Sequence, residues 1–159
     1  MATDDWLPPL MEFNDFGGSW DVYLAAMYAV FRKDFVTTSP RFRGRTLGLK
    51  RHPVIKGKEA TFWHLISEGE VEEDRIPDFR RCERIRWPRP LIEHEADSEI
   101  LVWTEPRGSN DNRIHIYLTD KRYLVVLADR GSYILPWTAY YIEHENGHRK
   151  YLQRHARYS

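Results

Sequence analysis

The chain has 159 residues, a formal net charge of zero at pH 7 and a hydrophobic share of 42%. These values predict one domain over residues 1–159 with a packed core, and they exclude a global electrostatic attraction to nucleic acid. Cys82 is the single cysteine, which excludes a disulfide framework and a thiolate metal cluster and favours a reducing cytoplasm. The N-terminus is acidic and too poor in apolar residues for a signal peptide or a membrane span, so no membrane partner is expected.

The N-terminal part is expected to form an irregular arm followed by a helix. Proline and glycine pairs interrupt residues 1–18, and the apolar side chains between them are expected to pin this arm to the body of the protein. Ser19 has the side chain of an N-cap, and apolar residues at helical spacing follow it as far as Phe35. This helix is expected to pack in the core rather than to bind a partner.

Residues 41–58 contain several basic side chains and no acidic one. A short strand is expected at Thr46–Lys50, after which Pro53 and Gly57 interrupt the chain. A basic run of this kind is most often a solvated surface. Its length without a carboxylate makes contact with phosphate groups the competing interpretation.

A second helix is predicted over Glu59–Glu68, because its apolar residues are spaced as one buried stripe and Gly69 follows as a stop signal. His64 and Glu68 are four residues apart on a neighbouring stripe, so the carboxylate could raise the pKa of the imidazole or orient its ring. A half-buried histidine with a local partner explains the same spacing, and the spacing alone favours that interpretation.

An acidic run over residues 68–74 precedes an arginine-rich run over residues 75–89. Pro77 suits the first turn of a helix that extends to about Trp87 and ends before two further prolines. Guanidinium groups match the geometry of phosphate, whereas ion pairs with the preceding acidic run explain the same residues equally well. The arginines expected on one side of this helix are Arg80, Arg81 and Arg84.

The residues from Glu99 onward are predicted to form a meander of antiparallel strands, and a basic helix follows over Asn146–Tyr158. A polar loop is expected over residues 105–112. The predicted fold class is therefore α+β, with N-terminal helices packed on a four-stranded antiparallel meander sheet and a C-terminal basic helix. The expected strands are Ile100–Trp103, Arg113–Leu118, Tyr123–Leu127 and Tyr133–Tyr141.

The last two predicted strands form a hairpin that carries the strongest functional signal. Gly131 suits a positive φ at the turn, and both strands are apolar on both faces, which predicts central strands covered on each side. Pro136 cannot donate to the ladder and therefore marks a bulge or the end of pairing. Strict alternation after it places Thr138 and Tyr140 on one face and Trp137 on the other.

The chain contains none of the short motifs of dinucleotide-binding proteins, P-loop proteins, α/β-hydrolases or zinc proteases. Its histidines are scattered, and no cluster of His, Asp and Glu has metal-ligand spacing. An enzyme that handles phosphate groups with this sequence is expected to work without a metal or another cofactor.

Four segments carry a resemblance to a known family: KEATFWHLISEG (58–69), RRCERIRW (80–87), RYLVVLADRGSYILPWTAYY (122–141) and the basic tail from His148. Together they resemble the barnase–EndoU–colicin–RelE superfamily of metal-independent ribonucleases, most closely its phage- and toxin-associated branches. The resemblance covers roughly residues 50–158. It lies in the order of the elements, since none of the four segments is a signature alone.

The resemblance implies an endoribonuclease that acts as a toxin or a phage-defence effector. In this chemistry a base removes the proton of the ribose 2′-hydroxyl, an acid protonates the leaving 5′-oxygen, and cations hold the phosphorane. The residues that we expect to do this are His64 as base or acid, Arg81 and Arg84 as phosphate ligands, and Thr138 and Tyr140 as groups that orient the phosphate or complete the proton transfer.

The sequence lacks the His/His/Lys constellation of better-defined members, which leaves His52 and His115 as further candidates for base or acid. The implied partners are an RNA substrate and an antitoxin or immunity protein, and the sequence gives no oligomeric state. The residues expected to contact RNA around the reaction centre are Lys50, Arg51, Lys58, Arg80, Arg149, Lys150 and Arg154.

Two other functions are kept as alternatives. A non-catalytic nucleic-acid-binding module would use the basic patches at 41–58, 75–89 and 148–157, and its affinity would fall steeply with salt. A protein-interaction module, such as an antitoxin or a phage accessory protein, suits the zero net charge and the many aromatic residues. Convergence of His64, Arg84 and Thr138 on one cleft is the feature that would distinguish the nuclease, whereas surface arginines that splay apart around an apolar patch would favour the interaction module.

Overall fold

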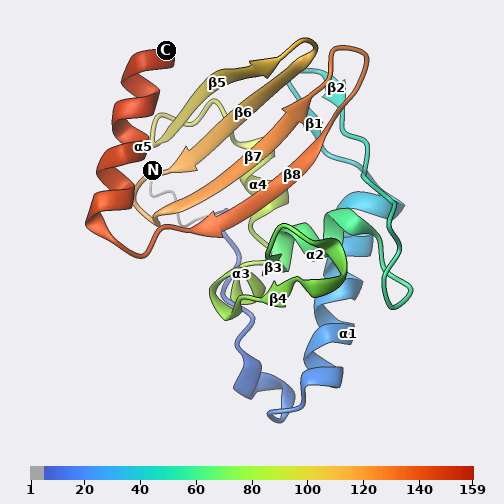
Figure 1. The fold of residues 1–159 in the computed structure, drawn as a ribbon. Helices are drawn as coiled ribbons and strands as arrows, with labels where there is room; N and C mark the ends of the chain where they lie inside the picture. The colour runs from blue at the N-terminus through green and yellow to red at the C-terminus, as the bar shows by residue number, and fades with distance from the viewer. Residues whose placement is uncertain (1–5) are drawn as a thin grey trace.

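The computed structural model describes residues 6–159, which form a layer of helices, a four-stranded antiparallel sheet and a C-terminal helix (Figure 1). The predicted α+β class with a four-stranded meander and a C-terminal helix is confirmed. The arm predicted at residues 1–18 is described from residue 6, and its first five residues lie outside the described part. The helices are α1 Trp20–Phe31, α2 Ala60–Ile66, α3 Phe79–Glu83, α4 Pro88–Glu93 and α5 Glu145–Tyr158, and the sheet strands are β5 Ile100–Gly108, β6 Asp111–Leu118, β7 Tyr123–Asp129 and β8 Ile134–Tyr141.

The N-terminal arm lies against the helical layer. It contains one turn of 3-10 helix, η2 Phe13–Phe16, and its apolar side chains pack on the main core as predicted. Backbone contacts fix it at two points: Met11 N donates to Glu83 O at 2.9 Å, and Trp87 Nε1 donates to Pro8 O at 2.8 Å. The arm is therefore part of the packed body in the described residues.

Two of the predicted helices are present with shifted ends. Ser19 caps α1 as expected, because its side chain accepts a hydrogen bond from Val22 N at 3.4 Å, and the helix continues as a π-helical segment, η3 Arg32–Thr37. The helix expected over Glu59–Glu68 is the shorter α2. It ends early because Ser67–Glu68 (β3) pairs with Ile76–Pro77 (β4) in a small antiparallel ladder.

The single helix predicted from Pro77 to Trp87 is wrong. Pro77 ends β4, and Asp78 then caps α3 by accepting hydrogen bonds from two backbone N–H groups. α3 is only five residues long. Pro88 begins α4 instead of terminating the preceding helix, because the first residue of a helix needs no N–H donor.

Residues 41–58 form a tiny hairpin and then run along the edge of the sheet. β1 Arg41–Phe42 pairs with β2 Arg45–Thr46, so Thr46 alone of the predicted strand Thr46–Lys50 lies in a strand. Gly48 N then donates to Ile134 O at 2.8 Å. This contact covers part of the outer edge of β8, which would otherwise expose unpaired backbone groups.

The first hairpin of the sheet is longer than predicted. Most of the expected polar loop at 105–112 continues the ladder between β5 and β6 as far as the pair Gly108 and Asp111, so the turn consists of two residues. Asn110 lies in that turn with a φ of 53°, a conformation that asparagine tolerates better than most residues. Polar side chains here belong to an exposed ribbon rather than to a loop.

The third hairpin, between β7 and β8, contains a bulge. β7 is central and buried, as predicted, whereas β8 is an edge strand, contrary to the prediction. Pro136 pairs with Leu127 and Thr138 pairs with Val126, so Trp137 is the extra residue of a β-bulge. A bulge is one of the two outcomes expected from a proline at this place. It interrupts the alternation of side chains along β8.

The sheet separates two apolar clusters. The larger one fills the space between the sheet and α1 to α4 and includes the fully buried Phe62, Leu91 and Ile116. The smaller one lies under α5, where Tyr151 and Leu152 pack against the opposite face. β8 is the edge strand of the sheet, so its outer edge borders both faces, and this edge lies beside α2 (Figure 1).

Candidate functional site

A pocket of about 520 Å³ lies at the outer edge of β8, next to α2 and α3. Four of the five residues predicted to be catalytic line it: His64 from α2, Arg81 from α3, and Thr138 and Tyr140 from β8. Lys50, predicted to contact RNA, lines it as well. Segments far apart in the sequence therefore bring five predicted residues to one cleft.

His64 is buried in the wall of this pocket, with its side chain 8% exposed. Nδ1 lies 3.2 Å from the Trp137 carbonyl oxygen, and Nε2 lies 2.6 Å from Glu72 Oε1. Both partners accept hydrogen bonds, so the imidazolium donates to both of them and the neutral ring donates to one. Burial lowers the pKa of His64, and the hydrogen bond with Glu72 opposes this shift without cancelling it.

The partner of His64 is Glu72 and not the predicted Glu68. α2 ends at Ile66, so Glu68 lies in β3 and no longer continues the same helical face. Glu72 begins the turn η4 Glu72–Asp74 and reaches back to the imidazole. The raised pKa that the helical spacing suggests for His64 does not occur, because the effect of burial is larger than that of the carboxylate.

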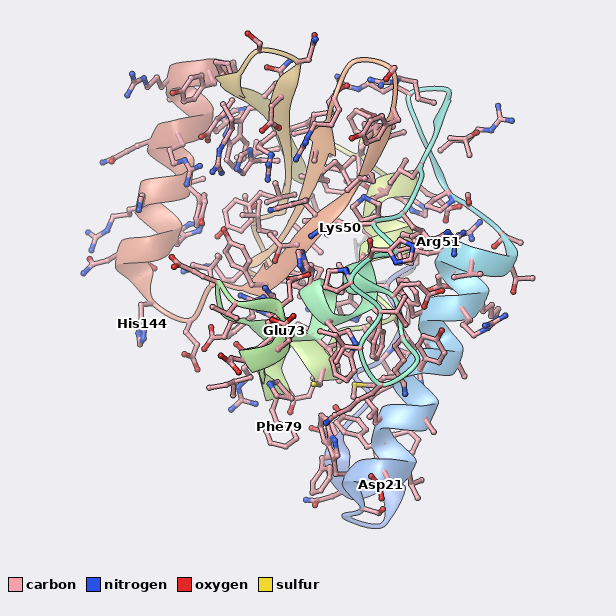
Figure 2. All side chains as sticks on the ribbon, turned by 45° about the vertical axis from the view of Figure 1, so that its right-hand side comes forward. Asp21, Lys50, Arg51, Glu73, Phe79 and His144 are labelled. Carbon is pink, nitrogen blue, oxygen red and sulfur yellow. The ribbon has the colours of Figure 1, made fainter. Side chains whose placement is uncertain are left out.

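Glu72 is the carboxylate that the pocket cations share. Its Oε2 lies 3.5 Å from Lys50 Nζ, and its Oε1 lies 4.0 Å from Arg75 Nη1. Burial raises the pKa of Glu72, but the hydrogen bond with His64 and the charge of Lys50 outweigh it, and the pKa lies below its usual range. In Figure 2 Lys50 lies beside α2 and the sheet, whereas Arg51 lies on the side of α1.

Arg81 connects α3 to the wall of the pocket. Its Nη1 donates to Ser67 O at 2.5 Å and to Thr138 Oγ1 at 3.4 Å. The Thr138 hydroxyl donates in turn to the backbone oxygen of His64 at 3.3 Å. The Arg81 side chain is 12% exposed, and Glu68 Oε2 lies 4.0 Å from its Nη2. The guanidinium is thus held in place before any ligand binds.

Tyr140 forms the border between the pocket and α5. Its hydroxyl is hydrogen-bonded to the hydroxyl of Tyr151, and the guanidinium carbon of Arg81 lies 5.3 Å from its ring centroid. Burial raises the pKa of Tyr140, so its hydroxyl keeps its proton at ordinary pH. This disfavours the expected part of Tyr140 in proton transfer and leaves its part in orienting a ligand.

Arg84 is the predicted catalytic residue that does not line the pocket. It is 9% exposed, and its guanidinium carbon lies 4.2 Å from the ring centroid of Tyr141 and 5.2 Å from that of Trp87. Nη1 donates to Glu83 Oε1 at 3.2 Å. α3 ends at Glu83, so Arg84 is not carried on the same helical turn as Arg81. Its contacts are those of a packing residue, so His64 and Thr138 meet in one cleft and Arg84, the third residue of the distinguishing set, does not join them.

The residues predicted to contact RNA lie in several places. Lys50 lines the first pocket, and Arg154 lines a second pocket on the α5 side of β8. On α5, Arg149 donates to Asn146 Oδ1 at 3.0 Å, and Lys150 is exposed. The basic residues of α5 therefore divide between a pocket and the exposed surface of the helix.

Three other predicted RNA contacts have neighbours within the protein. Arg51 pairs with Glu59 at 3.6 Å, and Arg80 pairs with Glu83 at 3.1 Å. The ammonium of Lys58 donates to a nearby backbone oxygen at 3.3 Å. Neither Glu59 nor Glu83 belongs to the acidic run 68–74, so the ion pairs predicted with that run are not made by these arginines; Arg75 and Arg81 make them instead, with Glu72 and Glu68. The surface pairs of Arg51 and Arg80 are weak and leave them accessible.

His115, an alternative base or acid, lies in the second pocket and is 4% exposed. Its ring stacks on Trp103 at a centroid distance of 4.9 Å. Nε2 lies 3.3 Å from Arg154 Nη2, and Nδ1 lies 3.2 Å from Arg113 O, a pattern that suits the neutral ring. Burial lowers the pKa of His115 to about 4. His52, the other alternative, is exposed and lines neither pocket.

The predicted site omits several residues of the first pocket, among them Glu70, Glu72, Arg75 and Trp137. Trp137 is expected on the face opposite to Thr138 only if the side chains of β8 alternate strictly between the two faces. Pro136 is the sequence signal of a bulge that interrupts this alternation. Glu72 lies eight residues after His64 in a segment without periodicity, so the sequence has no signal for that contact.

The pocket combines three cationic side chains (Lys50, Arg75, Arg81) with three carboxylates (Glu68, Glu70, Glu72), the imidazole of His64, which is hydrogen-bonded to Glu72, and two hydroxyls. Such a set can bind an anionic group such as a phosphate and exchange a proton with it. Among residues 6–159, no group of three or more His, Cys, Asp and Glu side chains is placed to hold a metal ion.

The chain matches no family model, no curated protein and no solved structure. None of the helices in residues 6–159 has the length and apolar character that crossing a membrane requires. The geometry of the pocket is therefore the basis on which a function can be assigned.

Proposed function

We propose that this pocket binds RNA and cleaves it without a metal, as the resemblance to the ribonuclease superfamily implies. The observation that carries the proposal is the convergence of Lys50, His64, Arg81 and Thr138 on one pocket. These residues come from a loop, two different helices and a strand, so local spacing does not account for their meeting. Side chains that served only packing or solubility would have no reason to share a cleft.

The cations of the pocket would hold the phosphodiester. Arg81 is already oriented by Ser67 and Thr138, so little side-chain freedom is lost when its guanidinium binds a phosphate oxygen. Lys50 and Arg75 both approach Glu72, and they would share their charge between this carboxylate and the phosphate. Positive charge held at this point would stabilise the phosphorane as it forms.

The pair of Glu72 and His64 would accept the proton of the attacking 2′-hydroxyl. Glu72 is ionised at neutral pH because its pKa lies below the usual range, and His64 Nε2 holds its carboxylate at 2.6 Å. Lys50 would donate a proton to the leaving 5′-oxygen. Because Lys50 Nζ lies 3.5 Å from Glu72 Oε2, the proton on Glu72 could return to Lys50 after the step.

The biological setting is proposed from the resemblance alone. It implies a toxin or phage-defence effector that acts in the cytoplasm on an RNA substrate. It also implies an antitoxin or immunity protein, which would neutralise the enzyme by covering the pocket.

The test is a cleavage assay in EDTA with purified protein and total RNA. His64→Ala removes the hydrogen bond that positions Glu72 as the proton acceptor, and it should lower the rate by about 10²- to 10⁴-fold, the usual contribution of a general base. His94→Ala is the matched control, because His94 stacks on Trp6 and lines no part of this pocket. Products with 2′,3′-cyclic phosphate ends are expected. Equal rates for the two variants would contradict the assignment of His64.

A second candidate function is binding of RNA without cleavage. It is favoured by the hydrogen bonds of His64, whose two ring nitrogens both have protein partners. In this case RNA would stay intact and would shift on a gel, with an affinity that falls steeply as salt rises. Intact RNA without a shift would favour the protein-interaction module instead.

A further inference from the structure

The second pocket, of about 270 Å³, lies on the α5 side of β8 and shares part of its wall with the first. The shared residues are Trp137, Thr138 and Tyr140, which line both pockets. The bulge at Trp137 and the position of β8 at the edge of the sheet make this possible, because a bound chain can cross an edge strand from one face to the other. The two pockets are thus adjacent compartments on either side of the same strand.

The second pocket has an excess of positive charge. Arg107, Arg113 and Arg154 line it, and Arg130 approaches the ring of Trp137 at 5.7 Å. The carboxylates that face these arginines are Glu105, which pairs with Arg154 at 2.6 Å, and Asp111, which pairs with Arg113 at 3.1 Å and with Arg130 at 3.3 Å. Four guanidinium groups against two carboxylates leave an excess of two positive charges.

Arg113 and Arg154 are held in fixed positions, and Arg154 donates two hydrogen bonds to Glu105. Arg113 is 5% exposed, uses Nε and Nη2 for Asp111, and has its guanidinium carbon 4.3 Å from the ring centroid of Trp137. Arg107 is exposed at the same pocket. Fixed guanidinium donors around a small polar cavity are suited to a phosphate group, which they can bind through two oxygens at once.

We propose that the second pocket is a phosphate-binding subsite, which takes the phosphate adjacent to the one held in the first pocket. The inference rests on the proposed function for its ligand, because an RNA strand supplies phosphates on both sides of each nucleoside. The shared wall of Trp137, Thr138 and Tyr140 then faces the nucleoside between the two phosphates. A free phosphate or mononucleotide is the other source of the same chemistry.

The test uses calorimetry at constant ionic strength with two probes, a nucleoside 3′,5′-bisphosphate and inorganic phosphate. Arg107→Gln removes a cation from the second pocket, and it should fold because Arg107 is exposed. Arg41→Gln is the control, since it removes the same charge from an exposed position in β1. Lys50→Gln removes a cation from the first pocket.

The bisphosphate should bind one to one and more tightly than inorganic phosphate. Arg107→Gln should weaken its binding about tenfold, as expected for loss of a charge-assisted hydrogen bond, and Arg41→Gln should leave it unchanged. A different result would identify a free phosphate as the ligand of the subsite. In that case Arg107→Gln would bind both probes more weakly than the wild type, and the wild type would bind the bisphosphate no more tightly than inorganic phosphate.

Equal affinities for wild type, Arg107→Gln and Arg41→Gln would overturn the subsite. If Lys50→Gln still weakened binding in that case, the proposed function of the first pocket would stand. The converse result, with weaker binding for Arg107→Gln and no effect of Lys50→Gln, would support the subsite and count against phosphate binding in the first pocket. The failures of the two proposals are therefore distinguishable.

Discussion

Acidification should destabilise the protein in part through His115. The ring is buried between Trp103 and the backbone of β6, and burial lowers its pKa from an ordinary 6.5 to about 4, with the Arg154 charge adding to the shift and the Glu105 charge opposing it. The unfolded chain therefore binds a proton at this residue at a higher pH than the folded chain. The stability that the neutral ring contributes is present above about pH 6.5 and is lost as the pH falls towards 4.

The size of this effect follows from the two pKa values. Between about pH 7.5 and pH 5, proton uptake by the unfolded state at His115 should lower the free energy of unfolding by about 2 kcal/mol. His64 shifts in the same direction, so the wild type should lose more than this amount. The measurement is urea unfolding at a series of pH values for wild type, His115→Gln and His144→Gln.

His115→Gln removes the titrating group, so its stability should fall less steeply with acid than that of the wild type, by about 2 kcal/mol over the same range. His144→Gln is the control, because the His144 side chain is 85% exposed and changes its surroundings little on unfolding. Parallel pH curves for wild type and His115→Gln would refute the reasoning. They would mean that His115 is solvated or charged in the folded protein.

Two further substitutions separate packing from chemistry. Arg84→Gln removes the contacts with Tyr141 and Trp87, and it should lower the free energy of unfolding by about 1–2 kcal/mol and leave RNA cleavage unchanged, as measured by denaturation and by the EDTA assay. A large loss of activity at unchanged stability would return Arg84 to the reaction centre. Leu65→Ala empties a fully buried position on the core face of α2 and should cost about 2–5 kcal/mol in the same unfolding experiment. A cost well below this range would show that the core under α2 is loosely packed.

The sheet was the part of the fold that the sequence predicted best. β-branched and aromatic runs with turn residues between them identify β6, β7 and β8, because a strand in a meander pairs with its neighbour in sequence and needs little long-range information. β5 was underestimated at its C-terminal end, where polar residues continue the ladder up to a two-residue turn at Asn110. Polar residues indicate that a segment is exposed to solvent, but they do not distinguish an exposed pair of strands from a loop.

The helices between residues 77 and 93 were predicted poorly for a local reason. Proline reads both as a helix breaker and as a first-turn residue, and Pro88 takes the second role. Pro77, expected in the first turn of the helix, ends β4 instead, and α3 stops at Glu83, so Arg84 lies outside the helix. Arg81 lines the pocket, and it lies within a helix in both the predicted and the observed structure.

The site itself was only partly accessible to sequence reasoning. His64 could be selected because it lies on a recognisable amphipathic helix that Gly69 follows as a stop signal. Thr138 could be selected because it lies on a recognisable strand just after Pro136. Glu72 could not, since its approach to His64 depends on how η4 folds back over α2. Trp137 enters the pocket through a bulge, and a bulge shifts side chains between faces in a way that strict alternation does not anticipate.

Attack by a ribose 2′-hydroxyl in the pocket of His64 and Arg81 is the central claim, and a chimeric substrate tests it most directly. The substrate is a DNA oligonucleotide that contains one ribonucleotide, incubated with the protein in EDTA. We expect a single cut, after the ribonucleotide, that leaves a 2′,3′-cyclic phosphate, and no cut in the all-DNA version. Cleavage of the all-DNA strand, or a chimeric strand that stays intact while total RNA is degraded without cyclic phosphate ends, would contradict the account.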